Sequence, residues 1–538
     1  MNIPLLNLKR QYKYLKNDVE RTISEILESG AYINGPYIKK FEKRLCEYLN
    51  VKHAIGVANG TDALVITLKA LGIKEGDEVI TTPFTFFATA EAISVVGAKP
   101  VFIDVKLNDF NIDPEKIEEK ITEKTKAIMP VHIFGTPADM DRINEIAKKH
   151  NLYVIEDACQ AIGAEYKGVK VGGIGDIACF SFFPTKNLGT YGDGGLITTN
   201  SDELATICRA IKAHGSGENG EKAFNLLNDI HEEVQEDKNV DDTVYNPKKY
   251  YNYLIGHNSR LDELHAGILN VKLDYLDEWN NKRIINAEYF DNNLKDSEFT
   301  LMDLDTRNKN VYHMYILQSE NREEITKKLS ENGIGYGVYY PVPLHLQKVY
   351  RELGYKEGDL PNAEYLSKRT VAIPVDPELT EEEKEYILNL LKEWGKMKIA
   401  IHQPHYFPWL GYLDKIAKVD KFIIMDEVQL TDNSPMIRNK FLENTGVEKF
   451  LSLSVSKKGH LEKKCKEIEL VNWNKIRKKH SRFIFYSYKN AKYFNEIWEK
   501  IKFIFEKDYI YLFDLEMDTI KILLSIFNIK TEIIFQSN

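Results

Sequence analysis

A lysine in a short, glycine-flanked segment is the residue best suited to covalent chemistry in this chain. Lys186 lies in the segment Phe-Phe-Pro-Thr-Lys-Asn-Leu-Gly and is followed by Gly-Asp-Gly-Gly at 192–195. Asp157 ends an apolar run earlier in the chain, a position that alone would also suit a solvated turn residue. A lysine amine that forms a Schiff base and a carboxylate that keeps a pyridine nitrogen protonated are the two groups that pyridoxal phosphate (PLP) most needs. Lys186 and Asp157 therefore predict a PLP enzyme.

Further residues suit the remaining parts of such a cofactor. Gly60 and Thr61 open a predicted helix, whose free N–H groups would favour a phosphate, and Ser181 would add a hydroxyl group. Phe86 could stack on the ring face, and Gln160 could reach the ring hydroxyl oxygen. Taken singly, these are a helix start and a core aromatic residue. Their joint occurrence around one lysine favours the cofactor site.

Alternation of short β-rich runs with helical stretches indicates the framework that would hold these residues. Between residues 50 and 200 this alternation predicts an α/β fold with a largely parallel sheet that is covered on both faces. Predicted helices include Ala63–Leu71 and Met140–His150. The predicted strands are His53–Ala58, Glu78–Thr82, Pro100–Val105, Lys126–Val131, Leu152–Ile155, Ile177–Phe182 and Gly195–Thr199.

The rest of the first 396 residues is predicted to form a smaller α+β unit. Helical patterning over Leu261–Trp279 precedes predicted strands at Tyr315–Leu317 and Gly337–Tyr340, and a final helix is predicted at Glu381–Trp394. The charged stretch 216–249 has few apolar residues and is predicted to be an inserted surface loop or flap. We expect a large domain at about 15–255, and a small domain at about 256–396 that also includes the N-terminal segment.

The bulk composition excludes several classes of protein. The formal net charge of −9 gives no reason to expect nucleic-acid binding. Apolar runs are too short for a membrane span, and the N-terminus does not resemble a signal peptide. Five scattered cysteines, without C-x-x-C spacing, indicate no disulfide framework or zinc ribbon and are predicted to be small core residues. We therefore expect a cytoplasmic protein.

Residues 1 to about 395 resemble the DegT/DnrJ/EryC1/StrS family of sugar-nucleotide aminotransferases. Besides Lys186 and its glycine-rich tail, the matching segments are Ala58–Leu64, Pro83–Phe86, Asp157–Ala161, Gly256–Glu263 and Tyr340–His345. The resemblance implies a fold-type I PLP enzyme, with a mostly parallel seven-stranded sheet in its large domain and a small α+β domain. It also implies cycling between PLP and pyridoxamine phosphate.

The same resemblance implies partners and further site residues. A homodimer with shared active sites is expected, in which Asn258 reaches the cofactor phosphate of the partner. His313, Tyr340 and His345 would lie near the sugar nucleotide, although each histidine could equally be structural. The donor would be L-glutamate, and the acceptor a nucleotide-linked keto sugar. Gly-Asp-Gly-Gly after the lysine resembles the family members that act on 3-keto-6-deoxyhexoses rather than those that act at C4. Relatives that act as dehydratases replace the lysine with histidine, so Lys186 argues against that activity.

At about residue 397 the sequence changes, and residues 397–538 are predicted to be a second, α/β domain that resembles the WbqC-like family. The segment His402–Tyr412 carries the resemblance, together with Asp426–Gln429, Arg438-Asn439 and Trp473-Asn474. His402, His405, Asp426 and Gln429 follow two apolar strands and could converge. They could bind a divalent metal through His402, His405 and Asp426, supply a histidine general base, or form a hydrogen-bond network without chemistry. Family members usually continue further, so a truncated or reduced domain is expected.

Together, the two parts predict a bifunctional enzyme that makes a nucleotide amino sugar for surface polysaccharides such as O-antigen. The second domain would acylate or aminoacylate the new amine. The alternative is a C4-keto-sugar aminotransferase whose second domain is a non-catalytic docking or oligomerisation module.

Overall fold

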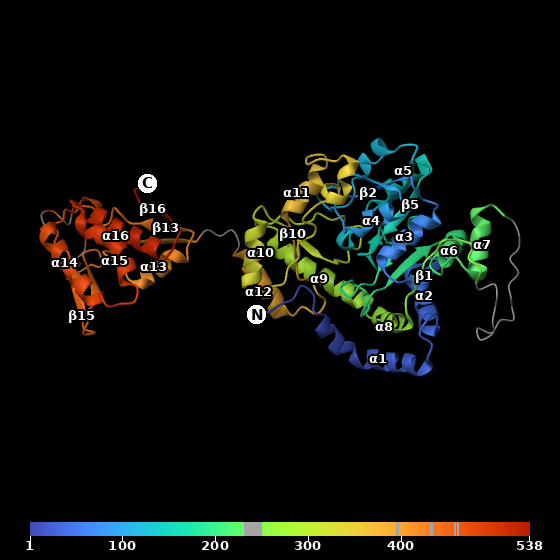
Figure 1. Cartoon of the computed structure of the whole chain (residues 1–538), viewed down its shortest axis with the longest axis horizontal. Coiled ribbons are helices and arrows are strands. Elements are labelled where there is room, and N and C mark those ends of the chain that lie inside the picture. The colour runs from blue at the N-terminus through green and yellow to red at the C-terminus, as the bar shows by residue number, and fades with distance from the viewer. Residues whose placement is uncertain (231–249, 394–397, 431–433, 457–458, 460–461, 538) are drawn as a thin grey trace. The chain divides into compact units, whose positions relative to one another are not determined.

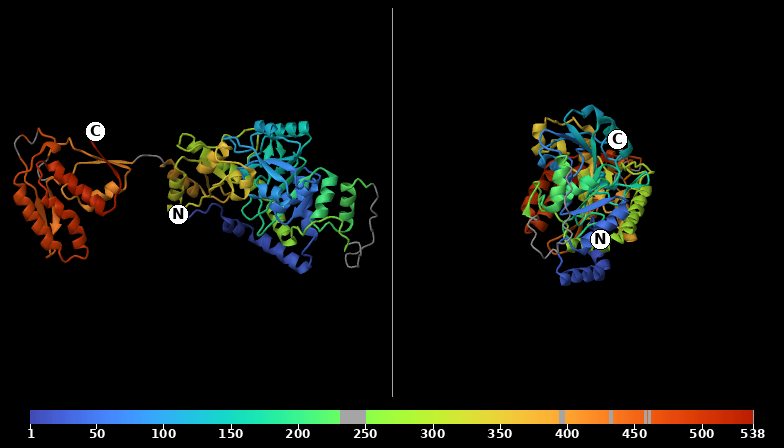
Figure 2. Two further views of the ribbon diagram at one scale, coloured as in Figure 1. Left: turned by 45° about the horizontal axis from the view of Figure 1, so that its top comes forward. Right: turned by 90° about the vertical axis from the view of Figure 1, so that its right-hand side faces the viewer.

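The computed structural model describes residues 1–230, 250–393, 398–430, 434–456, 459 and 462–537. The chain forms two compact units, Met1–Trp394 and Gly395–Asn538, and each is described separately (Figures 1 and 2). The expected boundary at about 397, and most of the predicted flap at 216–249, lie outside the described residues. None of the described helices is long and apolar enough to cross a membrane.

A seven-stranded sheet forms the centre of the first unit, in the order β1-β9-β8-β5-β4-β2-β3. Pairing is parallel from β8 through β5, β4 and β2 to β3, whereas β9 runs antiparallel to both β1 and β8. All seven predicted strands are present: β1 (His53–Val57), β2 (Glu78–Thr81), β3 (Lys99–Phe102), β4 (Thr125–Met129), β5 (Tyr153–Asp157), β8 (Ile177–Ser181) and β9 (Gly195–Thr199). The mostly parallel α/β fold is confirmed.

Helices cover both faces of this sheet. Successive residues of a strand therefore pack into two different apolar clusters, one on each face. Ile55 and Ile197 pack with α3, α4 and α6, whereas Ala54 and Leu196 pack with α2 and α8. Burial on both faces explains why the strands have apolar residues at successive positions rather than at alternate ones. The helices are α1 (Leu8–Ser29), α2 (Pro36–Leu49), α3 (Gly60–Ala70), α4 (Ala88–Val95), α5 (Met140–His150), α6 (Asp202–Ile211), α7 (Gly217–Leu227) and α8 (Glu263–Leu273). A small hairpin, β6 (Glu165–Tyr166) and β7 (Val169–Lys170), completes this part.

The smaller part of the unit contains a two-stranded antiparallel sheet of β10 (Tyr315–Gln318) and β11 (Thr370–Ile373). Around it lie α9 (Leu276–Leu294), α10 (Arg322–Glu331), α11 (Pro361–Arg369) and α12 (Glu381–Lys392). The N-terminal segment joins this part, since Ile3 bridges Ile334 and Arg10 forms an ion pair with Glu383 at 2.9 Å. Figure 1 accordingly shows the N-terminus beside α12.

Three predicted elements differ from the structure. Residues 217–227 of the predicted flap form the helix α7, which packs against α6 through the buried Ala223. The predicted helix Leu261–Trp279 is two helices, α8 and α9, with a break at Asp274 and Tyr275. Gly337–Tyr340 is not a strand: only Gly337 forms a bridge, to Ala372, and β11, which was not predicted, pairs with β10 instead.

The second unit is built on a three-stranded parallel sheet, β12-β13-β16. Its strands are β12 (Ile399–His402), β13 (Lys421–Ile424) and β16 (Glu532–Phe535), and a separate hairpin is formed by β14 (Arg438–Leu442) and β15 (Glu448–Ser452). Its helices are α13 (Leu410–Ala417), α14 (Trp473–Tyr488), α15 (Phe494–Glu506) and α16 (Leu512–Ile526). The carboxyl ends of the three parallel strands lie at one edge of this sheet, and the predicted site residues His402 and Asp426 lie at that edge.

Candidate active site

A cavity of about 670 Å³ opens at the carboxyl ends of β1, β5 and β8 in the first unit. Open α/β sheets bind their ligands at this edge. Residues from the loops after these strands line the cavity together with residues from the smaller part of the unit. The predicted site residues among them are Gly60, Thr61, Phe86, Asp157, Gln160, Ser181, Lys186, His313 and Tyr340.

Lys186 lies in the loop between β8 and β9 and is partly buried. Burial lowers the pKa of its ammonium group, while the nearby Cys159 thiol and Asp157 carboxylate favour the charged form. A lowered pKa increases the fraction of neutral amine, which is the nucleophilic form. The next residue, Asn187, fixes the loop, since its side-chain amide donates to Asn280 at 2.8 Å and to the Val311 carbonyl at 2.9 Å.

Asp157 ends β5 and is held in one orientation. Its side chain is buried, and its Oδ2 accepts a hydrogen bond from the Thr89 hydroxyl at 2.8 Å. Its Oδ1 accepts from the Cys159 N–H at 3.3 Å. Thr89 in turn lies 3.1 Å from the Thr85 hydroxyl. The carboxylate is therefore fixed on one wall of the cavity that also contains Lys186.

The amino end of α3 forms a cradle with space for an anion. Asn59 caps the helix, its side-chain oxygen accepting from the Asp62 N–H at 2.8 Å. A Cβ atom on Gly60 would come within 2.8 Å of Ser181 Cβ and 3.1 Å of Cys159 Sγ, so a side chain there would fill the cradle. Free N–H groups at a helix start, beside a hydroxyl group, are a donor set suited to phosphate.

Gln160 and Tyr340 lie on the same side of the cavity. Gln160 Oε1 accepts from the Phe134 N–H at 2.9 Å, and its Nε2 donates to the Tyr340 hydroxyl at 3.0 Å. The Tyr340 ring stacks on Phe134 with an interplanar angle of 12°. Phe86 is 59% exposed, which is unusual for a phenylalanine side chain. Phe86 also lines the cavity, where its ring could stack on a ligand.

The two predicted substrate-side histidines lie in different environments. His313 lines the cavity, and its Nδ1 has no hydrogen-bond partner among the described residues. Burial, with the charges of Lys186 and Arg283, lowers the pKa of His313 well below its ordinary value. His345 does not line the cavity: it is buried beneath α11, and its Nε2 lies 3.1 Å from Glu364. His345 therefore matches the structural alternative.

Asn258 does not line the cavity of its own chain. Its side chain is exposed, and its backbone forms a bridge with Ala213. A role at the cavity of a second subunit is compatible with this position and stays a prediction.

In the second unit, the carboxyl ends of the three parallel strands bring polar residues together. His402 ends β12, and its ring centroid lies 4.8 Å from that of His405. His405 is 2% exposed, has no partner on either ring nitrogen among the described residues, and has a pKa lowered to about 4 by burial and by His402. Asp426 follows β13 and accepts from the Ser537 N–H at 3.0 Å.

Gln429, the fourth predicted site residue of the second unit, lies apart from the two histidines. It is exposed and forms a backbone bridge with Lys464. Among the residues that the structure describes, no group of three or more His, Cys, Asp or Glu side chains is arranged to hold a metal ion. The geometry therefore gives no support to the metal site. The histidine general base and the hydrogen-bond network remain as alternatives.

Comparison with known proteins identifies both parts of the chain. Residues 13–392 match the model of the DegT/DnrJ/EryC1/StrS aminotransferase family. The chain belongs to this family. Residues 403–538 match the WbqC-like protein family. Both resemblances seen in the sequence are confirmed, and the first unit is a member of the sugar-nucleotide aminotransferases.

The alignments with individual relatives cover most or nearly all of each relative's length. The pleiotropic regulatory protein of Geobacillus stearothermophilus is 46% identical over 398 residues, which are 73% of this chain and 99% of that protein. The dTDP-3-amino-3,6-dideoxy-alpha-D-galactopyranose transaminase of Aneurinibacillus thermoaerophilus is 40% identical over 393 residues, which are 73% of this chain and 99% of the enzyme. The structure of NtdA from Bacillus subtilis with bound cofactor PMP matches at 33% identity and a TM-score of 0.62, covering 72% of this chain and 84% of that one.

DegT/DnrJ/EryC1/StrS aminotransferases are PLP-dependent, and the residues of this cavity fit the cofactor. The fit rests on the cradle at Gly60, on the buried carboxylate of Asp157 and on the amine of Lys186 in one cavity. PLP, when bound, supplies an electron sink for negative charge at the substrate carbon.

Sequence reasoning missed several residues of the aminotransferase site. Thr89 and Thr85 support Asp157, and Phe134 supports Tyr340, yet none lies in a motif that reveals this role. Cys159 was expected in the core, but it is only partly buried and lines the cavity. Its position beside Asp157 was the one signal available. All five cysteines are free.

Glu156, next to Asp157, is a buried carboxylate that fixes the end of β5. It accepts hydrogen bonds from the N–H groups of Gly172, Ile174 and Gly175 at 2.7–2.8 Å. His132 Nδ1 accepts from the Ala138 N–H, so Nε2 carries the proton and donates to Glu156 at 3.1 Å. Burial alone would raise the pKa of Glu156, but these hydrogen bonds lower it below its ordinary value.

Replacing Glu156 with glutamine is expected to lower the free energy of unfolding by about 3 kcal/mol, because hydrogen bonds to a buried charge are lost. A carboxylate whose pKa is lower in the folded than in the unfolded state stabilises the fold at pH values above its unfolded pKa, which is about 4.3 for glutamate. This stabilisation is lost as the pH falls through the pKa of the folded state. The difference between wild type and variant in denaturant unfolding should therefore shrink below about pH 4. Glu145→Gln, at an exposed glutamate of α5, is the control. A pH-independent difference would contradict this account.

Proposed function

We propose that the first unit transfers the amino group of L-glutamate to a nucleotide-linked 3-keto-6-deoxyhexose, giving a nucleotide amino sugar in the cytoplasm. The observation that carries this proposal is the convergence of Lys186, Asp157 and the amino end of α3 in one cavity. The two half-reactions would use the same cavity in turn, with L-glutamate leaving as its keto acid before the keto sugar enters. Residues 1–396 would act as one functional domain, and 397–538 as another.

Each residue would have a defined role. Lys186 would hold the cofactor covalently and, once its amine is freed by the substrate amine, carry the proton between the reacting carbons. Asp157 would keep the ring nitrogen protonated, since a carboxylate beside a cation favours the charged form. Gly60, Thr61 and Ser181 would hold the phosphate, and Phe86 would stack on the ring. Gln160 would orient the ring hydroxyl, with Tyr340 and His313 on the sugar side.

Amination at C3 rather than C4 is supported by two observations. The chain carries Gly-Asp-Gly-Gly after the lysine, and the Aneurinibacillus relative is a 3-amino-3,6-dideoxyhexose transaminase. A 4-keto sugar is the alternative.

We further propose a homodimer in which Asn258 completes the phosphate site of the partner subunit. The support is its exposed position outside the cavity of its own chain. Light scattering on the purified protein that gave a monomer would contradict this assembly.

For the second unit we propose acylation or aminoacylation of the new amine, in the synthesis of a surface polysaccharide such as O-antigen, which would make the enzyme bifunctional. His402 or His405 would act as the base that takes the amine proton, and the centroids of the two rings lie 4.8 Å apart. Covalent linkage would raise the effective concentration of the amino sugar at the second unit. A non-catalytic docking or oligomerisation module is the alternative.

One experiment tests both units. The full chain and a chain ending at residue 396 are incubated with L-glutamate and either a 3-keto or a 4-keto nucleotide 6-deoxyhexose, and the products are analysed by NMR and mass spectrometry. We expect 3-amino sugar from both chains. We expect a further mass increase, given candidate acyl donors, from the full chain only. The aminotransferase family model matches residues 13–392, and a relative is covered over 99% of its length by 73% of this chain, which makes the shorter chain a fair test. Amination only at C4 would contradict the sugar assignment.

A further inference from the structure

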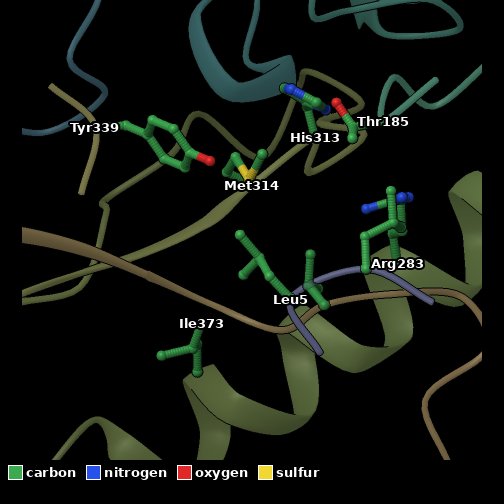
Figure 3. Close-up of a pocket in the computed structure, with 9 residues that line it drawn as sticks. Leu5, Thr185, Arg283, His313, Met314, Tyr339 and Ile373 are labelled. Carbon is green, nitrogen blue, oxygen red and sulfur yellow. The ribbon is translucent and has the colours of Figure 1, made fainter. Parts of the chain in front are cut away.

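A second cavity of about 250 Å³, which we call the side chamber, adjoins the aminotransferase site (Figure 3). Four of its lining residues also line the main cavity: Thr185, His313, Met314 and Tyr339. Through these shared walls, the side chamber adjoins the cavity that contains Lys186. Its remaining lining residues are Leu5, Leu6, Arg283, Ile373 and Val375.

Arg283 is the charged residue of the side chamber, and its charge is poorly compensated. It extends from α9, is 4% exposed, and forms a hydrogen bond from Nη1 to the Tyr312 carbonyl at 3.3 Å. Its buried Nε has no partner among the described residues. Burial lowers the pKa of Arg283 to about 10, although Asp376 nearby favours the charged form. A buried cation without an ion pair is costly, and an incoming anion would remove that cost.

The other walls of the side chamber favour a short chain that ends in an anion. His313 has a pKa lowered by burial and by both Lys186 and Arg283, so its imidazole is neutral and adds no competing charge. His313, whose Nδ1 has no partner among the described residues, and Thr185 are further polar residues that line the same chamber as Arg283 (Figure 3). Leu5, Leu6, Ile373 and Val375 provide apolar contacts that suit methylene groups and offer nothing to sugar hydroxyls.

We propose that the side chamber binds the distal carboxylate of the amino donor, with Arg283 as its principal partner. This inference rests on the proposed transaminase function. The donor must place its amino group beside the cofactor and Lys186, and a five-carbon dicarboxylic amino acid could then extend its side chain past Thr185 and His313. A guanidinium pairs with a carboxylate through two parallel hydrogen bonds, which gives selectivity as well as affinity. A uronic-acid sugar carries the same group, but the apolar walls disfavour its hydroxyls.

Binding of glutarate, which has no amino or keto group, tests the chamber without any reaction. Calorimetry on the full PLP-loaded protein should give a dissociation constant that rises about 10- to 100-fold in Arg283→Met, as expected for loss of a charge-assisted pair. Arg307→Met, at an exposed arginine paired with Asp305, is the control. Wild type should also prefer glutarate over its monoamide, a comparison that needs no variant. Equal binding by wild type and Arg283→Met, or equal affinity for the two ligands, would overturn the proposal.

The half-reaction with amino donors separates recognition from structural damage. L-norvaline has the carbon chain of L-glutamate with a methyl group in place of the distal carboxylate. Arg283→Met should slow the spectral change with L-glutamate about 10- to 100-fold and leave that with L-norvaline unchanged. Equal loss with both donors would overturn the proposal in favour of a structural arginine. Displacement of glutarate by UDP-glucuronic acid but not by L-glutamate would overturn the donor assignment. If no donor reacts at all, the transaminase function fails, whereas Arg283-dependent glutarate binding would still establish a carboxylate site.

Discussion

Lys186→Ala is expected to lower the turnover of keto sugar by about 10⁴-fold, because the variant would lose the amine that we propose carries the reacting proton. The covalent attachment of the cofactor would be lost as well. Lys186 lies in a loop fixed independently by Asn187, so the fold should survive the change. Turnover is measured as amino sugar formed under saturating PLP, beside the melting temperature.

The matched control is Lys167→Ala, at a lysine outside the cavity whose ammonium forms an ion pair with Asp141. It should keep wild-type turnover. Substantial turnover in Lys186→Ala, with a normal melting temperature, would show that another residue carries the proton.

Asp157→Asn should lower turnover by about 10²- to 10³-fold, the range for loss of one electrostatic partner in an active site. Asparagine keeps the shape of the side chain, but a neutral amide cannot hold the ring nitrogen in its protonated form. The Thr89 hydroxyl, which donates to Oδ2 at 2.8 Å, should still find the amide oxygen in one orientation.

Thr89→Val separates orientation from charge at the same site. It removes the hydrogen bond and keeps the carboxylate, so its effect should be much smaller than that of Asp157→Asn. Equal losses in the two variants would mean that Asp157 acts through structure rather than through its charge.

The sheet and most of the site could be predicted because both depend on local sequence patterns. The strands of the large sheet are short runs rich in apolar residues, and Asp157 and Ser181 lie where two of them end. Parallel strands place those ends at one edge, so their side chains converge without any knowledge of packing. Gly60 could be placed in the same way, because the sequence predicts a helix that opens at Gly60 and Thr61, as α3 does.

What could not be predicted depends on contacts between distant segments. The pairing of β10 with β11 joins residues far apart in the chain, so no local sequence pattern could indicate it. His313 and His345 look alike in the sequence, yet one faces the cavity and the other contacts Glu364. Nothing in the sequence of α9 distinguishes Arg283, and only the fold shows that its guanidinium is buried and has no ion pair among the described residues.

In the second unit the sequence indicated the strand ends, but not which side chains meet there. His402 and His405 lie together because the turn after β12 places both beside Tyr412. Gln429, although close to Asp426 in the chain, is exposed. Two carboxylate oxygens of the fully buried Glu516 have no partner among the described residues, and burial raises the pKa of this group well above its ordinary value. No pattern in α16 distinguishes it from a surface glutamate.

The visible absorbance spectrum of the purified full chain, recorded with PLP before and after addition of L-glutamate, tests the central claim most directly. We predict a band from PLP joined to Lys186 that disappears with L-glutamate as the cofactor gains the amino group, and that returns when the correct keto sugar is added. Lys186→Ala should not show this band. A wild-type protein that forms no such band with added PLP, or whose band does not respond to any amino donor, would contradict the assignment of this cavity as a transaminase site.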